Sequence, residues 1–162
     1  MVFLATDRDL EENEMEYAID ILDMDNCIVD DINRLLSLLP SSERQVCEAD
    51  IEKLLNYSDT TVVIATTTAG QIIGMGTICP LYVLGATECV IHDVVVLKDY
   101  RGQGVAQRIM EQLIEVGFDF HEARQIDLTS SSGRAAANHL YQKLGFERYD
   151  TNVYRLKASI TL

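Results

Sequence analysis

A strand that leads directly into a helix through a glycine-containing turn is the feature that most limits how this chain can fold. Residues 88–97 (ECVIHDVVVL) carry the β-branched run of a buried strand, and residues 105–117 place apolar side chains at helical spacing. Between them, Gly102 and Gly104 permit a tight turn. Because the first turn of a helix has unpaired backbone N–H groups and a partial positive charge, the stretch predicts a phosphate-binding turn.

Length and composition predict a single domain at residues 16–162, preceded by a flexible acidic arm at residues 1–15. The chain has 162 residues, 48% of them hydrophobic, which is enough for one sizeable core. No apolar run approaches the roughly 20 residues of a membrane span. The first residues are also too acidic for a secretory signal. We therefore expect a cytoplasmic protein that does not bind membranes.

The net charge of −13 is concentrated near the N-terminus, where residues 1–31 contain 11 acidic residues and one basic residue. The remainder of the chain is nearly balanced. Because no basic stripe is present, we expect no nucleic-acid binding. The acidic segment either attracts a cationic substrate or is simply a solvated charge run.

The cysteines and histidines do not have the spacing of a metal site. The cysteines are Cys27, Cys47, Cys79 and Cys89, and the histidines are His92, His121 and His139. Without a CxxC pair or metal-ligand spacing, they predict reduced thiols and no metal.

The other patterns predict the element order β, α, α, β, β, β, α, β, α, β. Strands are expected at residues 16–22, 60–68, 71–84, 88–97, 125–130 and 146–157, and helices at residues 28–39, 48–56, 105–117 and 134–144. Asp25 or Asn26 is expected to cap the first helix, and Pro80 to lie at a bend or a sheet edge. This order implies an α/β (α+β) fold with a mixed sheet and helices on both faces.

A second segment makes the glycine-containing turn a more specific signal. The turn at residues 101–106 lacks the Gly-Lys-Ser/Thr of a P-loop, and a dinucleotide fingerprint would lie in the first βα unit. About 25 residues later, SSSGRAAANHLYQKLGF places Tyr141 on a helix. With both segments, residues 16–157 resemble the GNAT superfamily of acetyl-CoA-dependent N-acetyltransferases.

The resemblance implies a mostly antiparallel sheet splayed between its fourth and fifth strands, with acetyl-CoA as cosubstrate and no metal. The coenzyme A diphosphate would bind the turn formed by Arg101, Gly102, Gln103, Gly104, Val105 and Ala106. Backbone groups near Val94, Val95 and Val96 would pair with pantetheine. Tyr141 would lie near the thioester sulfur; the alternative is a tyrosine buried against Phe146.

Some positions depart from the family pattern. Arg134 stands seven residues before Tyr141, where many relatives have asparagine, and Asn138 lies closer, within the helix. Arg134 and Lys143 could instead meet phosphates of coenzyme A, and Asn138 is the other cofactor-binding candidate. The segment VIHDVVV is similar to the HIEDVVV of glucosamine-phosphate acetyltransferases. Thr129 replaces an acidic residue of that branch, which counts against a sugar-phosphate substrate.

Three residues are candidates for removing the proton of the acceptor amine: Glu88, His92 and Asp93. Histidine suits base catalysis near neutral pH. Strand alternation puts Glu88 and His92 on one face and Asp93 on the other, unless a bulge intervenes.

The predicted function is acetyl transfer to a primary amine of a small molecule or peptide by direct attack. Two alternatives are a coenzyme A-binding sensor without catalysis and a nucleotide-binding regulatory domain. The strand expected at residues 146–157 could serve the domain's own sheet or a homodimer contact.

Overall fold

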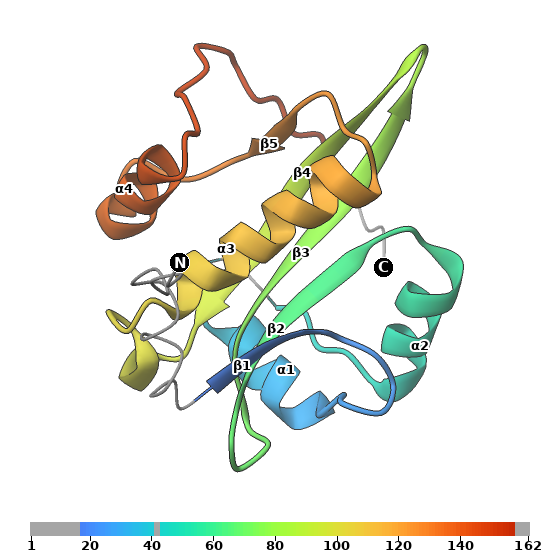
Figure 1. Cartoon of the computed structure of the whole chain (residues 1–162), viewed down its shortest axis with the longest axis vertical. Helices are drawn as coiled ribbons and strands as arrows, with labels where there is room; N and C mark the ends of the chain where they lie inside the picture. Colours follow the sequence, from blue (N-terminus) through green and yellow to red (C-terminus); the bar gives the residue numbers. More distant parts are fainter. Residues whose placement is uncertain (1–16, 41–42, 158–162) are drawn as a thin grey trace, which may run out of the picture. The chain divides into compact units, whose positions relative to one another are not determined.

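Figure 1 shows the computed structural model of the chain, in which residues 17–40 and 43–157 are described. Its contacts divide into two units, one ending at Thr129 and the other beginning at Ser130. The expected acidic arm at residues 1–15 lies outside the described residues. Among the residues described, no helix has both the length and the apolar composition of a membrane span.

The first unit contains a sheet and three α-helices. In chain order its elements are β1 (Tyr17–Ile21), α1 (Val29–Ser37), α2 (Glu48–Tyr57), β2 (Thr61–Thr67), β3 (Ile72–Val83), β4 (Ala86–Val96), the 3-10 helix η1 (Lys98–Tyr100), α3 (Val105–Glu115), the π-helix η2 (Val116–Phe120) and β5 (Ile126–Leu128). The second unit contains α4 (Ala135–Lys143).

The five strands lie in the sheet in sequence order, from β1 to β5. The pairs β1–β2, β2–β3 and β3–β4 are antiparallel, whereas β4 and β5 are parallel. Short turns join β2 to β3 and β3 to β4. Between β4 and β5, α3 provides the long crossover that a parallel pair requires. The predicted mixed, mostly antiparallel sheet is therefore confirmed.

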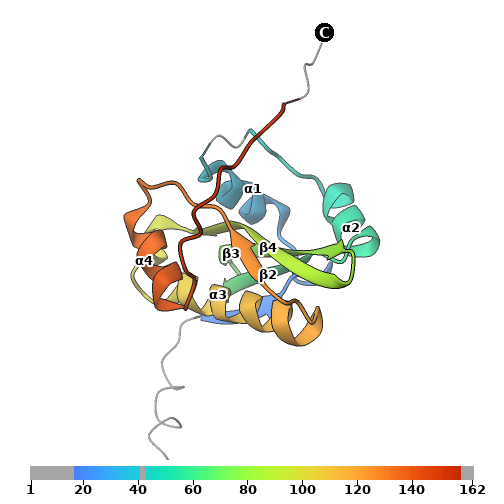
Figure 2. The ribbon, with the colours of Figure 1, turned by 90° about the horizontal axis from the view of Figure 1, so that it is seen from above.

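Helices cover both faces of this sheet, as predicted (Figure 2). On one face, Leu35 of α1 and Ile51 of α2 belong to the same buried cluster as Ile64 and Met75 of the sheet. On the other face, α3 packs against β3, where Gly74 and Gly76 carry no side chain. The two glycines let the helix approach the strand closely.

A buried carboxylate links α1 to the start of β3. The side chain of Asp31 accepts a hydrogen bond from the Ile72 N–H at 3.0 Å. It also forms an ion pair with Arg34 at 3.1 Å. These partners offset the cost of burying a charge. They also fix α1 over the sheet.

The first helix begins later than the sequence predicted. Neither Asp25 nor Asn26 caps it, because Asn26 forms a local turn with Asp23: the Asp23 N–H donates to Asn26 Oδ1 at 2.8 Å and the Asn26 N–H donates to Asp23 Oδ1 at 2.9 Å. Such turns compete with helix formation for the same polar groups. α1 therefore begins at Val29, with Ile28 as its N-cap.

The strand predicted at residues 146–157 is wrong, since these residues form neither helix nor strand. Their apolar side chains are largely exposed, with Tyr149 at 83%, Val153 at 69% and Tyr154 at 88%. A strand needs a hydrogen-bonded neighbour, and in the described part of the chain the sheet ends at β5. Alternating apolar residues alone are not sufficient.

Pro80 lies at a sheet edge, which confirms one of the two predicted outcomes. β2 pairs with β3 only as far as Ile78, so β3 has a single neighbour, β4, at Pro80. A proline without an N–H is tolerated at such a position. The β3–β4 hairpin thus continues three residues past it, to Val83.

We expect Gly76→Ala to lower the free energy of unfolding by about 1–3 kcal/mol, the usual cost of overpacking a core. A Cβ at this position would lie 2.8 Å from Leu113 Cδ1 and 3.1 Å from Ile109 Cγ2, and both side chains are fully buried. Gly133→Ala is the control, because no atom lies within 4 Å of its added Cβ. Urea denaturation compares the two variants. A Gly76→Ala protein as stable as the wild type would contradict the close approach of α3.

Candidate active site

β4 contains a bulge at Asp93 and Val94, which together lie opposite Gly76 of β3. The register on either side is given by the pairs Thr77–His92 and Met75–Val95. Asp93 has a left-handed backbone with φ of 56°. Aspartate tolerates this conformation better than a β-branched residue does. The extra residue shifts the alternation of side chains along β4.

The shift changes the expected position of Asp93. Strict alternation would put Asp93 on the face opposite to His92, but both residues line the same cavity in the structure. The bulge is the reason, because it adds one residue between the regular pairs. The bulge therefore places the Asp93 carboxylate at the cavity, next to the backbone of His92.

β4 separates from β5 next to this bulge. The two strands pair only where Cys89–Ile91 lie beside Ile126–Leu128, while β4 continues to Val96. Within the described residues, β5 thus gives no partner to residues 92–96. This confirms the splay predicted between the fourth and fifth strands.

The turn after β4 has the backbone that its glycines predicted. Gly102 and Gly104 have φ values of 76° and 80°. No atom lies within 4 Å of a Cβ added at Gly102, so the left-handed backbone, not a lack of space, requires glycine. α3 begins at Val105, and the N–H groups of Val105 and Ala106 precede its first intrahelical bond, from Arg108 to Gly104. Such groups can bind an anion.

Side chains hold this turn in place. Arg101 Nε donates to the Val96 carbonyl at 3.1 Å, and Gln103 Nε2 donates to the Asp99 carbonyl at 3.0 Å. The Tyr17 hydroxyl donates to the Gln103 carbonyl at 3.3 Å. Arg101 and Gln103 therefore shape the turn, and the backbone is the part of it best suited to hold a phosphate.

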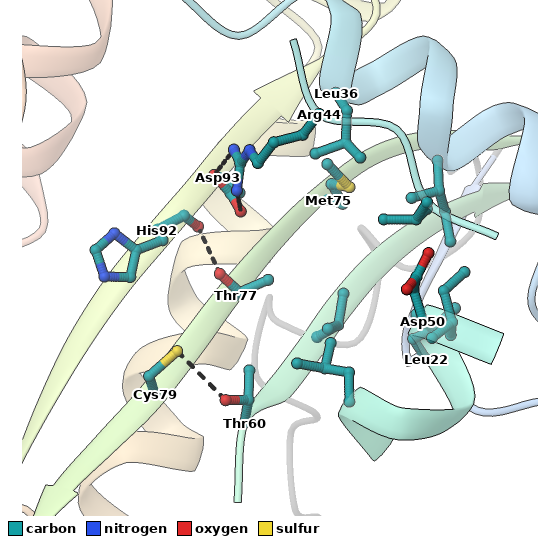
Figure 3. Close-up of a pocket in the computed structure, with 15 residues that line it drawn as sticks. Leu22, Leu36, Arg44, Asp50, Thr60, Met75, Thr77, Cys79, His92 and Asp93 are labelled. Carbon is teal, nitrogen blue, oxygen red and sulfur yellow. Dashed lines mark hydrogen bonds and ion pairs between the residues drawn. The ribbon is translucent and has the colours of Figure 1, made fainter. Parts of the chain in front are cut away.

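A cavity of about 480 Å³ lies on the sheet face that carries α1 and α2 (Figure 3). Its aliphatic lining comes from both helices and from the sheet and includes Ile32, Leu36, Ile51, Leu54, Val62 and Met75. Its charged lining residues are Arg44, Asp50 and Asp93. Volumes of this size are typical of small-molecule sites.

An ion pair closes one side of this cavity. Arg44 Nη1 and Nη2 donate to the two carboxylate oxygens of Asp93 at 3.0 Å and 2.6 Å. The hydrogen bond to Asp93 raises the pKa of Arg44, and partial burial opposes this effect. Asn33 supports the same loop, since its side chain exchanges hydrogen bonds with the Val46 backbone at 2.9 Å and 2.8 Å. The loop between α1 and α2 is thus tied to the bulge.

The other two candidate bases have different surroundings. Glu88 forms an ion pair with Arg124 and is not among the cavity-lining residues. The imidazole of His92 is exposed and points away from Thr77 and Met75 (Figure 3). The His92 carbonyl accepts a hydrogen bond from the Thr77 hydroxyl at 3.2 Å, which fixes the backbone beside the bulge.

In the second unit, Tyr141 is buried and contacts Phe146 edge to face, with ring centroids 6.2 Å apart. Burial raises the pKa of Tyr141, and the charge of Arg134 partly offsets the effect. The Asn138 side chain donates to the Ser131 carbonyl at 3.0 Å. Asn138 therefore helps to order the SSSG loop.

Comparison with known proteins shows the family. The model of the Acetyltransferase (GNAT) family matches residues 29–146. The chain belongs to this family. It is an acetyl-CoA-dependent N-acetyltransferase, in agreement with the resemblance of its two sequence segments.

Solved structures share the fold of this acetyltransferase. An acetyltransferase from Trypanosoma brucei has a TM-score of 0.73 at 21% identity, covering 88% of this chain and 99% of its own. An aminoglycoside acetyltransferase from an uncultured soil metagenomic sample has a TM-score of 0.73 at 21% identity, covering 90% and 100%. Glucosamine-6-phosphate N-acetyltransferase from Arabidopsis thaliana has a TM-score of 0.71 at 17% identity, covering 86% of this chain and 97% of its own. A sequence comparison with curated proteins gives no match.

The cysteine on β4 of the acetyltransferase is a poor nucleophile. Cys89 is completely buried, and burial raises the pKa of its thiol, with a smaller contribution from Cys79. Only the thiolate form is reactive. The described residues also contain no cluster of three or more His, Cys, Asp or Glu side chains suited to a metal ion.

Sequence reasoning missed the cavity and Arg44. The aliphatic residues of α1 have helical spacing, which predicts burial but does not distinguish a packed core from a cavity wall. Arg44 lies in a loop whose sequence carries no motif. Its partner Asp93 was a candidate, but the ion pair depends on the bulge that turns this carboxylate towards the loop.

Proposed function

We propose that this acetyltransferase acetylates a primary amine by direct attack on acetyl-CoA beside the bulge of β4. The observation that carries the proposal is the order of three features along residues 92–106. These are a bulge, a strand segment without a partner in β5, and a glycine turn immediately before a helix. Acetyl-CoA supplies an activated thioester when bound. The features occur in the order needed to hold first the acetyl end and then the diphosphate of one extended ligand.

The turn would bind the diphosphate through backbone N–H groups of residues 102–106. The geometry supports this, since Gly102 and Gly104 are left-handed and α3 starts immediately after them. Backbone groups of residues 94–96 would pair with pantetheine as a missing strand does. Arg134 remains a candidate cation for a phosphate, while Asn138 would act indirectly, through the loop that it orders.

His92 is the proposed base for the acceptor amine. An ammonium has no lone pair, so it must lose a proton before it attacks the thioester carbon. Asp93 is less suited to this role because its charge is already balanced by Arg44. Glu88 is likewise engaged, by Arg124. Because the His92 ring points away from the sheet residues of the cavity, a water molecule would connect it to the amine.

Tyr141 would stabilise the charge that develops on sulfur through a hydrogen bond. A phenol with a reference pKa near 10 donates its proton to a thiolate of pKa near 8.5 only at a cost of about 2 kcal/mol. Burial raises the pKa of Tyr141, which increases this cost and keeps the hydroxyl protonated at neutral pH. Hydrogen bonding is therefore favoured over full proton transfer.

No covalent enzyme intermediate is proposed, because the thiol on β4 is buried and protonated. We also propose that residues 16–162 work as one catalytic domain. Support comes from the family match, which spans residues 29–146 and hence parts of both units.

The function predicts that the protein releases coenzyme A and forms an N-acetylated product when acetyl-CoA and a suitable primary amine are mixed with it.

Tyr141→Phe should lower kcat by about 10²-fold, the usual effect of removing one donor to a developing charge, with little change in the KM for acetyl-CoA. Tyr149→Phe is a matched control because Tyr149 is 83% exposed. Mass spectrometry of the N-acetylated product measures the turnover of the wild type and of both variants. Tight acetyl-CoA binding without turnover of any amine would indicate a sensor, and an unchanged kcat in Tyr141→Phe would remove Tyr141 from the mechanism.

The proposed base predicts a change in pH dependence. Because a general base acts only in its unprotonated form, kcat/KM of the wild type should rise with pH. His92→Gln should remove this rise and lower kcat/KM by about 10²-fold. His139→Gln, which changes an exposed histidine of α4, should retain it. If Asp93→Asn removes the rise and His92→Gln does not, Asp93 is the base.

A further inference from the structure

The cavity beside the bulge has walls that favour an apolar ligand. Helices α1 and α2 contribute Leu36, Ile51 and Leu54, and the sheet contributes Val62 and Met75. Each is aliphatic, so a ligand gains free energy here by removing apolar surface from water. The volume of about 480 Å³ lies within the range of small-molecule sites.

Two hydroxyl groups on the sheet side of this cavity already use their donors. The Thr60 hydroxyl donates to Cys79 Sγ at 3.4 Å, and the Thr77 hydroxyl donates to the His92 carbonyl at 3.2 Å. A sugar buried here would leave several of its hydroxyl groups without partners, which opposes binding. The walls therefore discriminate against polyhydroxylated ligands.

The charges of the lining residues favour a single positive charge. Arg44 is paired with Asp93, while Asp50 accepts a hydrogen bond from the Cys47 N–H at 2.9 Å, which lowers the pKa of Asp50 and keeps it ionised at neutral pH. Two carboxylates thus face one guanidinium. In Figure 3, Asp93 and Asp50 lie on opposite sides of the labelled apolar residues Leu36 and Met75. Among the described residues that line the cavity, an anionic ligand would find no cation outside the Arg44–Asp93 ion pair to compensate its charge.

We propose that the acceptor is a small amine with one ammonium group on an apolar body, and that the body fills this cavity while the nitrogen lies beside Asp93. This inference rests on the proposed function, because it takes the cavity as the acceptor side of the same site. After deprotonation, the nitrogen attacks the thioester carbon, the carbon–sulfur bond breaks, and an amide forms. The proton that leaves the amine balances the one that the coenzyme A thiolate gains.

The acceptor class is tested with the full chain at saturating acetyl-CoA. The apolar amines are hexylamine and 2-phenylethylamine, and the polar amines are kanamycin and glucosamine 6-phosphate. We expect kcat/KM to be at least about tenfold higher for the apolar pair. Turnover that favours a polar amine would overturn this inference and leave the acetyltransferase function intact. Absence of turnover with every amine, although acetyl-CoA binds, would instead overturn the proposed function.

A comparison with a peptide substrate tests whether the acceptor is a small free amine or the N-terminus of a peptide. A short peptide amide with phenylalanine at its N-terminus presents the same aromatic group on a longer body. We expect 2-phenylethylamine to be the better acceptor, because the cavity has the volume of a small-molecule site. A peptide preferred by about tenfold or more would overturn the small-molecule assignment.

Two neighbouring leucines of α2 give a matched pair of variants. Leu54 and Leu55 are both half-buried, but only Leu54 lines the cavity. Leu54→Trp should raise the KM for 2-phenylethylamine by about tenfold without changing the KM for acetyl-CoA, and Leu55→Trp should leave both unchanged. If Leu54→Trp does not fold, Leu54→Ala should shift the preference towards bulkier amines. Equal effects at the two positions would contradict the proposal.

Discussion

The bulge at Asp93 is the feature on which the rest of the site depends. One extra residue opposite Gly76 gives Asp93 a left-handed backbone and changes which side chains of β4 face each side of the sheet. As a result Val95 joins the buried cluster under α1 and α2, while Val96 lies beside Gly74 on the α3 face. The strand thus keeps a packed core on both faces and still turns a carboxylate towards the cavity.

The ion pair of Asp93 with Arg44 extends this effect to a distant part of the sequence. It joins the loop between α1 and α2 to the strand that leads to the glycine turn. Because Arg44 is 57% exposed, the pair contributes little to the free energy of folding, about 1 kcal/mol or less. Its importance is geometric: it places one wall of the proposed acceptor cavity next to the proposed donor site.

Most of the fold could be predicted from sequence, because hydrophobic periodicity and glycine positions act locally. Gly102 and Gly104 predicted the turn before α3, and the two family segments predicted the splayed sheet. The strand at residues 146–157 could not be judged this way, since a strand also needs a neighbour. The same limit applies to Asp93, whose side depends on a bulge, and to Arg44, whose partner lies 49 residues away. Non-local pairing, not local propensity, decides these positions.

The most direct test of this account is a crystal structure of the chain with coenzyme A bound. We expect diphosphate oxygens about 2.7–3.2 Å from backbone nitrogens of residues 102–106. We also expect the pantetheine amides to pair with β4 beyond the bulge, at residues 94–96, with the thiol end directed towards the cavity lined by Asp93. A diphosphate bound away from the turn, or pantetheine that does not contact β4, would contradict it.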